Sequence, residues 1–391
     1  MGVAVEELCS VEGFGSVLDL FPFGRCGLLL SFPSCSRVLG LGEDESETLE
    51  ERSAPGLLLG EETLHACNCI DSQTTEYAFQ VTRSGVVAAK VNSQIEVLAT
   101  WLAGSLSRRI QVAARFDSSP PGTSGVLVAS NGGQLQALQL LKSAGSVASF
   151  KLEEQSSWQL GGEVACMSQA EGFCAVGLWS KELCIFRTVQ SGMEEVREKL
   201  PPETLPRSIV FGRIASRLQL FVGLGDGRVL SFVVDQASGL LQGHREVHVG
   251  SQPVKLLTLP PPAADEGGDE AEAKDAGGDV MMREAGAEQR VLAMSCHATQ
   301  ISGSSTGQLS YSAVCYPSVT NAAVFEDGRA SGQEYLAIVS EGRLVLVQME
   351  ASKRTHIRTV NLGASPTKMT YHASTGLCAV ACHEPSTLHA A

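Results

Sequence analysis

Two cysteine patterns are missing from this sequence of 391 residues. None of its 12 cysteines belongs to a Cys-x-x-Cys pair, and together they show no paired framework. The Asn-x-Ser/Thr acceptor of secreted glycoproteins is missing as well. Structural zinc sites, redox motifs and disulfide-stapled domains depend on such cysteine patterns. The absence of these patterns and of the glycosylation acceptor predicts a reducing compartment, the nucleus and also the cytoplasm.

Long apolar runs are absent too. No apolar stretch approaches the roughly 18 residues of a membrane span, and the first residues lack the basic start of a signal peptide. We therefore expect no membrane partner.

Positive charge is scarce. The net charge is −14, and nine of the 43 acidic residues fall within residues 261–290, against three basic residues there. Because affinity for nucleic acid depends on Lys and Arg side chains that neutralise phosphates, direct binding of DNA or RNA by this chain alone is not expected.

Motifs for catalysis are also scarce. We find no His-Glu-x-x-His motif and no carboxylate pair in a distinctive setting, and the eight histidines follow no pattern. The sequence therefore predicts no catalytic residues, no cofactor and no enzyme. A hydrolase with carboxylates or histidines around a central channel stays as a minor alternative.

What the sequence does contain is one repeated pattern. An apolar, β-branched run, a short polar or glycine turn and a second alternating run predict a β-hairpin. Seven such hairpins lie at residues 27–41, 77–90, 126–140, 173–186, 220–232, 291–302 and 335–347.

The spacing of these hairpins decides the fold class. Their turns centre on residues 34, 84, 132, 180, 226, 297 and 341, so the steps are 50, 48, 48, 46, 71 and 44 residues. The long step contains the acidic segment 261–290, whose low apolar content predicts a disordered loop. Units of this size without helical periodicity predict an all-β, seven-bladed, WD40-like β-propeller, and the even period argues against two stacked sandwiches.

Several short strings resemble a known family in the same order. They are residues 163–166 (EVAC), 174–179 (CAVGLW), 206–209 (PRSI), 223–227 (GLGDG), 238–241 (SGLL), 249–253 (VGSQP), 356–360 (HIRTV) and 365–366 (SP). They resemble the large adaptor subunit of the UV-damaged-DNA-binding complex. The same family includes a large cleavage and polyadenylation factor subunit and a propeller subunit of a splicing complex.

The resemblance implies a domain plan. Residues 1–22 resemble the end of a preceding propeller, 23–354 one seven-bladed propeller, and 355–391 the truncated start of a following one. It also implies a non-enzymatic scaffold that binds a cullin in a nuclear ubiquitin ligase linked to DNA damage repair. Substrate receptors would bind only if the missing propellers were present, because the family holds them between its first and third propellers. The alternative is a scaffold of an mRNA cleavage/polyadenylation or splicing complex.

Two residues are predicted to bind protein. Trp179 ends a strand at a polar turn, where a large aromatic side chain is typical of an interface anchor. Pairing the flanking strands about a turn near Glu171 brings Glu163 beside Trp179, and both match positions on the family's cullin-facing surface. The competing interpretation is that Trp179 packs between blades and Glu163 is a solvated charge.

Two further strings have structural interpretations. In residues 223–227 the Asp-Gly pair precedes a strand, not a helix, which favours a hairpin turn over a nucleotide loop. Cys378, Cys382 and His383 lack a fourth ligand, so no metal site is predicted.

Overall fold

The computed structural model describes residues 2–24, 27–41, 49–70, 76–92, 94–104, 108–117, 124–142, 150–189, 192–200, 204–261, 288–304, 307–326, 334–354, 365–372 and 377–383. These residues form strands and turns, and no α-helix occurs among them. The chain divides into two compact units, Met1–Lys353 and Arg354–Ala391, which are described separately below. None of the described residues belongs to a helix that could span a membrane.

The first unit contains seven blades. Blades 1 to 5 are four-stranded sheets in which sequence order is also spatial order. Their strands are β2 (Asp19–Pro22), β3 (Gly27–Ser31), β4 (Ser36–Leu41) and β5 (Leu49–Glu51) in blade 1; β6 (Thr63–Ile70), β7 (Glu76–Thr82), β8 (Gly85–Val91) and β9 (Ile95–Leu102) in blade 2; β10 (Ile110–Asp117), β11 (Ser124–Ser130), β12 (Gln134–Lys142) and β13 (Phe150–Gln159) in blade 3; β14 (Val164–Ala170), β15 (Phe173–Leu178), β16 (Glu182–Val189) and β17 (Gly192–Lys199) in blade 4; and β18 (Pro206–Ile214), β19 (Arg217–Leu224), β20 (Arg228–Val234) and β21 (Leu241–His248) in blade 5.

The last two blades share one sheet. Blade 6 comprises β22 (Lys255–Leu259), β23 (Arg290–Met294), β24 (Ala298–Gly303) and β25 (Leu309–Val314), and blade 7 comprises β26 (Val319–Glu326), β27 (Glu334–Ser340) and β28 (Arg343–Arg354). The N-terminal strand β1 (Gly2–Val11) lies between β28 and β25. It pairs with β25 in parallel, with Gly2 opposite Ala313 and Val3 opposite Val314. Strand β1 is therefore the fourth strand of blade 7 and joins it to blade 6.

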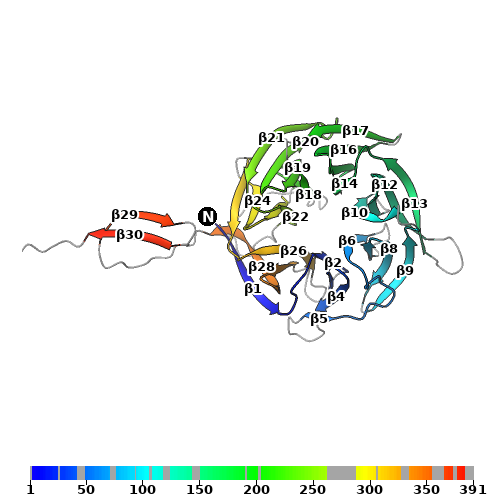
Figure 1. Ribbon diagram of the computed structural model, residues 1–391, viewed down its shortest axis with the longest axis horizontal. Helices are drawn as coiled ribbons and strands as arrows, with labels where there is room; N and C mark the ends of the chain where they lie inside the picture. Colours follow the sequence, from blue (N-terminus) through cyan, green and yellow to red (C-terminus); the bar gives the residue numbers. More distant parts are fainter. Residues whose placement is uncertain are drawn as a thin grey trace, which may run out of the picture. The chain divides into compact units, whose positions relative to one another are not determined.

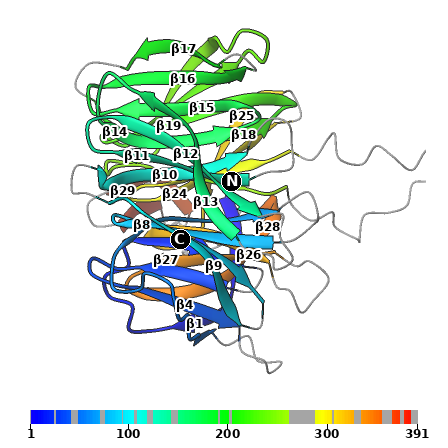
Figure 2. The same cartoon turned by 90° about the vertical axis from the view of Figure 1, so that its right-hand side faces the viewer.

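The blades close a ring around a central axis (Figure 1). The innermost strands β2, β6, β10, β14, β18, β22 and β26 contact one another in that order, and β26 contacts β2 again. Figure 2 shows blade 4 from the side, where β15, β16 and β17 follow one another towards the edge of the ring. The prediction of a seven-bladed all-β propeller is confirmed.

Apolar side chains fill every interface between neighbouring blades. One core cluster runs through blades 2, 3 and 4, and five others join blades 1 and 2, 4 and 5, 5 and 6, 6 and 7, and 7 and 1. This explains why a central strand such as β15 is buried along its whole length, since both of its faces meet a neighbouring blade. The outer strand β21 is mostly exposed because it has no such neighbour.

Each of the seven predicted hairpins is the second and third strand of one blade. Their turns, which we call the hairpin rim, are residues 32–35, 83–84, 131–133, 179–181, 225–227, 295–297 and 341–342. Because neighbouring strands of a blade run in opposite directions, all seven turns lie on the same face of the ring. The residues that lead into the innermost strands lie on this face as well. Strand β22 ends and β23 begins on the opposite face of the ring. Residues 262–287 of the acidic loop that is predicted to be disordered lie outside the described part.

A β-bulge recurs where the innermost strands begin. The first two strands of blades 2, 3, 4, 5 and 7 change register directly after their first pair, at Leu64, Gln111, Ala165, Arg207 and Thr320. A bulged residue has no direct partner on the neighbouring strand, and its side chain is redirected. The bulges therefore redirect one side chain near the hairpin rim in each of these five blades.

The described residues 365–372 and 377–383 of the second unit form an antiparallel hairpin of β29 (Ser365–His372) and β30 (Leu377–His383). Its register changes between Pro366 and Lys368. The Oγ1 of the bulged Thr367 donates to the Ala381 carbonyl at 3.0 Å, as Thr320 Oγ1 donates to the Val339 carbonyl at 3.1 Å in blade 7. The hairpin thus has the local geometry of the first two strands of a blade.

The predicted domain boundaries stay predictions. Residues 2–11 and 19–22, which resemble the end of a preceding propeller, form β1 of blade 7 and β2 of blade 1 in this structure.

Candidate rim site on blades 4 and 5

Glu163 and Trp179 lie side by side on the hairpin rim of blade 4. The Trp179 backbone N–H donates to the Glu163 carbonyl at 3.0 Å, which continues the ladder of β14 and β15 beyond Val164 and Leu178. The predicted cross-strand placement of the two residues is confirmed. Their predicted role in binding protein stays a prediction.

The Trp179 side chain is exposed over 48% of its surface, while its neighbour Leu178 is fully buried. Trp179 is the first residue after β15, where the chain turns through Lys181 at a φ of 66°. Glu163 is also exposed. The interpretation that Trp179 is packed away between blades therefore does not hold.

In blades 3 and 5 the corresponding position holds no aromatic side chain. The same backbone hydrogen bond joins Asn131 to the Arg109 carbonyl in blade 3, at 3.2 Å, and Gly225 to the Leu205 carbonyl in blade 5, at 3.0 Å. Asn131 and Gly225 are ordinary turn residues. Because the turn needs no tryptophan, Trp179 is better explained as a contact residue.

A third residue completes the site from the next blade. The guanidinium carbon of Arg207 lies 6.0 Å from the centre of the Trp179 ring, within the range of a cation–π contact. Arg207 is exposed and is the bulged residue of β18. Sequence analysis missed its role because the contact joins two blades, and no local pattern signals it.

Close packing between the two blades sets this contact. A side chain at Gly177 would place its Cβ 2.8 Å from the Pro206 ring and 2.9 Å from the Cys166 sulfur. The absence of a side chain at Gly177 lets β15 approach the start of β18, and Arg207 follows Pro206 directly. Burial raises the pKa of the Cys166 thiol to about 12, so this thiol is neutral beneath the site at physiological pH.

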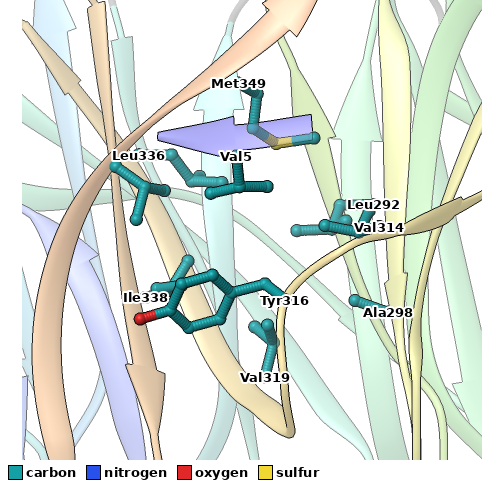
Figure 3. A pocket seen from close by; sticks show the side chains of 10 residues that line it. Val5, Leu292, Ala298, Val314, Tyr316, Val319, Leu336, Ile338 and Met349 are labelled. Carbon is teal, nitrogen blue, oxygen red and sulfur yellow. The ribbon is translucent and has the colours of Figure 1, made fainter. Parts of the chain in front are cut away.

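A small apolar pocket lies elsewhere, at the junction of blades 6 and 7 (Figure 3). Val5 of β1, Ile338, Met349 and the ring of Tyr316 contribute to its wall. The Tyr316 hydroxyl donates to Glu7 Oε2 at 3.1 Å, and burial raises the pKa of Tyr316. The pocket is a gap in the packing beneath β1, and every residue that lines it except Tyr316 is apolar.

A serine motif escaped the sequence analysis. Residues 303–307 (GSSTG) match the Gly-x-Ser-x-Gly pattern of nucleophile elbows, which requires a turn from a strand into a helix. Here Gly303 ends β24 and Leu309 begins its antiparallel neighbour β25. The Ser304 N–H donates to the Gln308 carbonyl at 2.7 Å across this hairpin turn, and Ser305 lies outside the described residues. The string thus leads into a strand and not into the helix that a nucleophile elbow requires.

The structure describes both the string 223–227 and the two cysteines Cys378 and Cys382. Asp226 and Gly227 form the β19–β20 turn, where Gly227 has a φ of 89° and Asp226 Oδ2 accepts a hydrogen bond from Arg228 Nε at 2.6 Å. The prediction of a turn is confirmed. Cys378 and Cys382 are exposed on β30. Within the described ranges no group of three His, Cys, Asp or Glu side chains could hold a metal ion.

Comparison with known proteins places the chain in a family. The profile of the RSE1/DDB1/CPSF1 second beta-propeller matches residues 25–263. The chain belongs to this family. Membership of the RSE1/DDB1/CPSF1 second beta-propeller family confirms the resemblance found in the sequence.

Curated relatives of the RSE1/DDB1/CPSF1 family extend the match. The chain is 28% identical over 378 residues to DNA damage-binding protein 1 of Oryza sativa subsp. japonica, covering 92% of this chain and 30% of the relative. It is 27% identical to DNA damage-binding protein 1a of Arabidopsis thaliana, covering 97% and 32% of the two chains. For DNA damage-binding protein 1 of Drosophila melanogaster the identity is 26%, covering 97% and 30%. The chain spans about a third of the length of these relatives.

Proposed function

We propose that this chain is a non-enzymatic scaffold propeller that uses the hairpin rim of blade 4 to bind a cullin in a nuclear ubiquitin ligase linked to DNA damage repair. The proposal rests chiefly on one observation, the exposed Trp179 held beside Glu163 on a rigid rim. Family membership and the names of the relatives support it.

The chemistry of the pair suits a helical protein segment. A half-exposed indole offers a large, stiff apolar surface with little side-chain entropy to lose on binding. The adjacent carboxylate can accept hydrogen bonds from a basic side chain of the partner. Because the strands of a propeller blade are held on both faces, the pair is preorganised for binding.

The second unit supports a larger assembly. Its hairpin has the bulge and the threonine hydrogen bond of a blade's first two strands, and its apolar side chains Met369, Tyr371 and Leu377 are exposed by 73%, 62% and 66%. We assign this hairpin to the start of a following propeller. Binding of substrate receptors would require those further propellers.

The test measures binding of the N-terminal region of a cullin to the purified chain. Trp179→Ala should weaken binding at least about 30-fold, as expected for an anchor residue, and Glu163→Ala should weaken it less. Affinity unchanged in both variants would overturn the proposal. Capture of cleavage/polyadenylation or splicing subunits in place of a cullin would overturn it too.

A matched control uses Leu240, which is exposed by 51%, similar to Trp179. It lies at the β20–β21 turn, on the face of the ring opposite the hairpin rim. Leu240→Ala removes an equally exposed apolar side chain and should leave cullin affinity unchanged.

A further inference from the structure

Arg207 reaches Trp179 from the neighbouring blade. Its backbone is the bulge of β18, its Cγ would lie 3.8 Å from a Cβ at Gly225 of the same blade, and its guanidinium faces the indole of blade 4. A bulge redirects the extra side chain, which explains how a residue of blade 5 reaches a ring of blade 4.

The guanidinium retains its hydrogen-bonding capacity. Two other arginines near turns are paired: Arg83 with Glu62 at 2.9 Å, and Arg228 with both Asp226 and Glu246. For Arg207 no hydrogen-bond or ion-pair partner occurs among the described residues. Its five N–H donors therefore face solvent beside an exposed aromatic ring.

The rim site thus carries one acidic and one basic residue next to the tryptophan. Glu163 lies beside Trp179 on blade 4, and Arg207 contacts the same indole from blade 5. A cation that only stabilised the tryptophan would add little binding energy at such an exposed site. A planar guanidinium with free donors also suits a carboxylate of a partner, because it can bind both oxygens at once.

We infer that Arg207 is the third contact residue of the rim site and binds an acidic side chain of the same partner segment. The inference rests on the proposed function and deepens it. The segment presents an apolar or aromatic side chain to Trp179, a basic side chain to Glu163 and an acidic side chain to Arg207. This polarity fixes the direction in which the segment crosses the boundary between blades 4 and 5.

The experiment titrates the N-terminal region of a cullin against the chain by calorimetry at low and high salt. Arg207→Gln should weaken binding about tenfold and reduce its salt dependence, and Arg207→Glu should weaken it further by like-charge repulsion. Arg207→Lys should retain most of the salt dependence. If Arg207 only positions Trp179, the Gln and Glu variants will bind equally, which would overturn the inference.

A matched control is available on blade 1. The guanidinium of Arg37 lies 5.7 Å from the ring of Phe32, also on the hairpin rim. Arg37→Gln removes the same kind of contact far from blades 4 and 5 and should leave affinity unchanged. If Trp179→Ala abolishes binding while all Arg207 variants bind normally, the inference fails and the proposed function stands. If Trp179→Ala also binds normally, the proposed function itself fails.

Discussion

The ammonium of Lys255, on the innermost strand of blade 6, lies 3.0 Å from Asp19 Oδ1 on the innermost strand of blade 1. This ion pair spans blade 7. The same ammonium donates to the Leu18 carbonyl at 3.2 Å and to the side-chain oxygen of Asn321, which lies on β26 of blade 7. One side chain thus ties together the three blades at which the two ends of the ring meet.

Removing this ammonium should loosen the closure of the ring. Lys255→Met removes the ammonium from Asp19 and Asn321, so we expect the free energy of unfolding to fall by about 1–2 kcal/mol, discounted for the partial exposure of the pair. Urea denaturation at neutral pH measures the change. The control is Lys151→Met, which removes an exposed ion pair with Glu153 along one strand and should change the free energy by less than about 0.5 kcal/mol. Equal effects of the two variants would contradict the special role of Lys255.

His65 should make stability depend on pH. It lies edge-on to Phe21, its Nε2 is buried without a hydrogen-bond partner in the described part, and burial lowers its pKa to about 4. An unfolded histidine has a pKa of about 6.5, so the unfolded state binds more protons between these values. The contribution of neutral His65 is complete above about pH 6.5 and is lost as the pH falls towards 4.

This loss should reach about 2 kcal/mol between pH 7.5 and pH 5, as measured by urea denaturation. His65→Leu has no titrating group and should flatten this part of the pH profile. A profile as steep in His65→Leu as in the natural protein would exclude His65 as the cause.

Two glycines with positive φ allow the cost of backbone strain to be distinguished from the cost of a steric clash. Gly172 has a φ of 79° and open space around it, whereas a Cβ at Gly227, with a φ of 89°, would collide with the backbone carbonyl of Gly250. Gly172→Ala should lower the free energy of unfolding by about 1 kcal/mol, the usual effect of this backbone conformation. Gly227→Ala should lower it by at least about 2 kcal/mol more, and thermal unfolding of both variants measures the difference. Equal losses would mean that the β19–β20 turn relaxes without resistance.

The cysteines should differ sharply in reactivity. Hydrogen bonds from the backbone of Ser251 lower the pKa of the half-exposed Cys296, while burial raises the pKa of Cys166 and Cys174 to about 12. Because the thiolate is the nucleophile, iodoacetamide at pH 7.5 should modify Cys296 readily and leave Cys166 and Cys174 intact in the folded protein. Peptide mass spectrometry over time reads out each site. Rapid labelling of Cys166 would show that blades 4 and 5 separate in solution.

The sequence alone determined the hairpins and the pair of residues on blade 4. The turn at Asp226 and Gly227 and the position of Trp179 opposite Glu163 both depend on local alternation and turn chemistry, which act over fewer than about 20 residues. The even spacing of the turns then predicted seven blades, because each apolar face needs a neighbour of the same kind.

Only the tertiary structure decided how the ring closes and what lies across a blade boundary. The place of β1 between β28 and β25 joins residues more than 300 positions apart, and the contacts of Lys255 with Asp19 and of Arg207 with Trp179 join different blades. No local preference specifies such neighbours. They arise when whole sheets bury their shared apolar faces, since that packing alone sets the distance between blades.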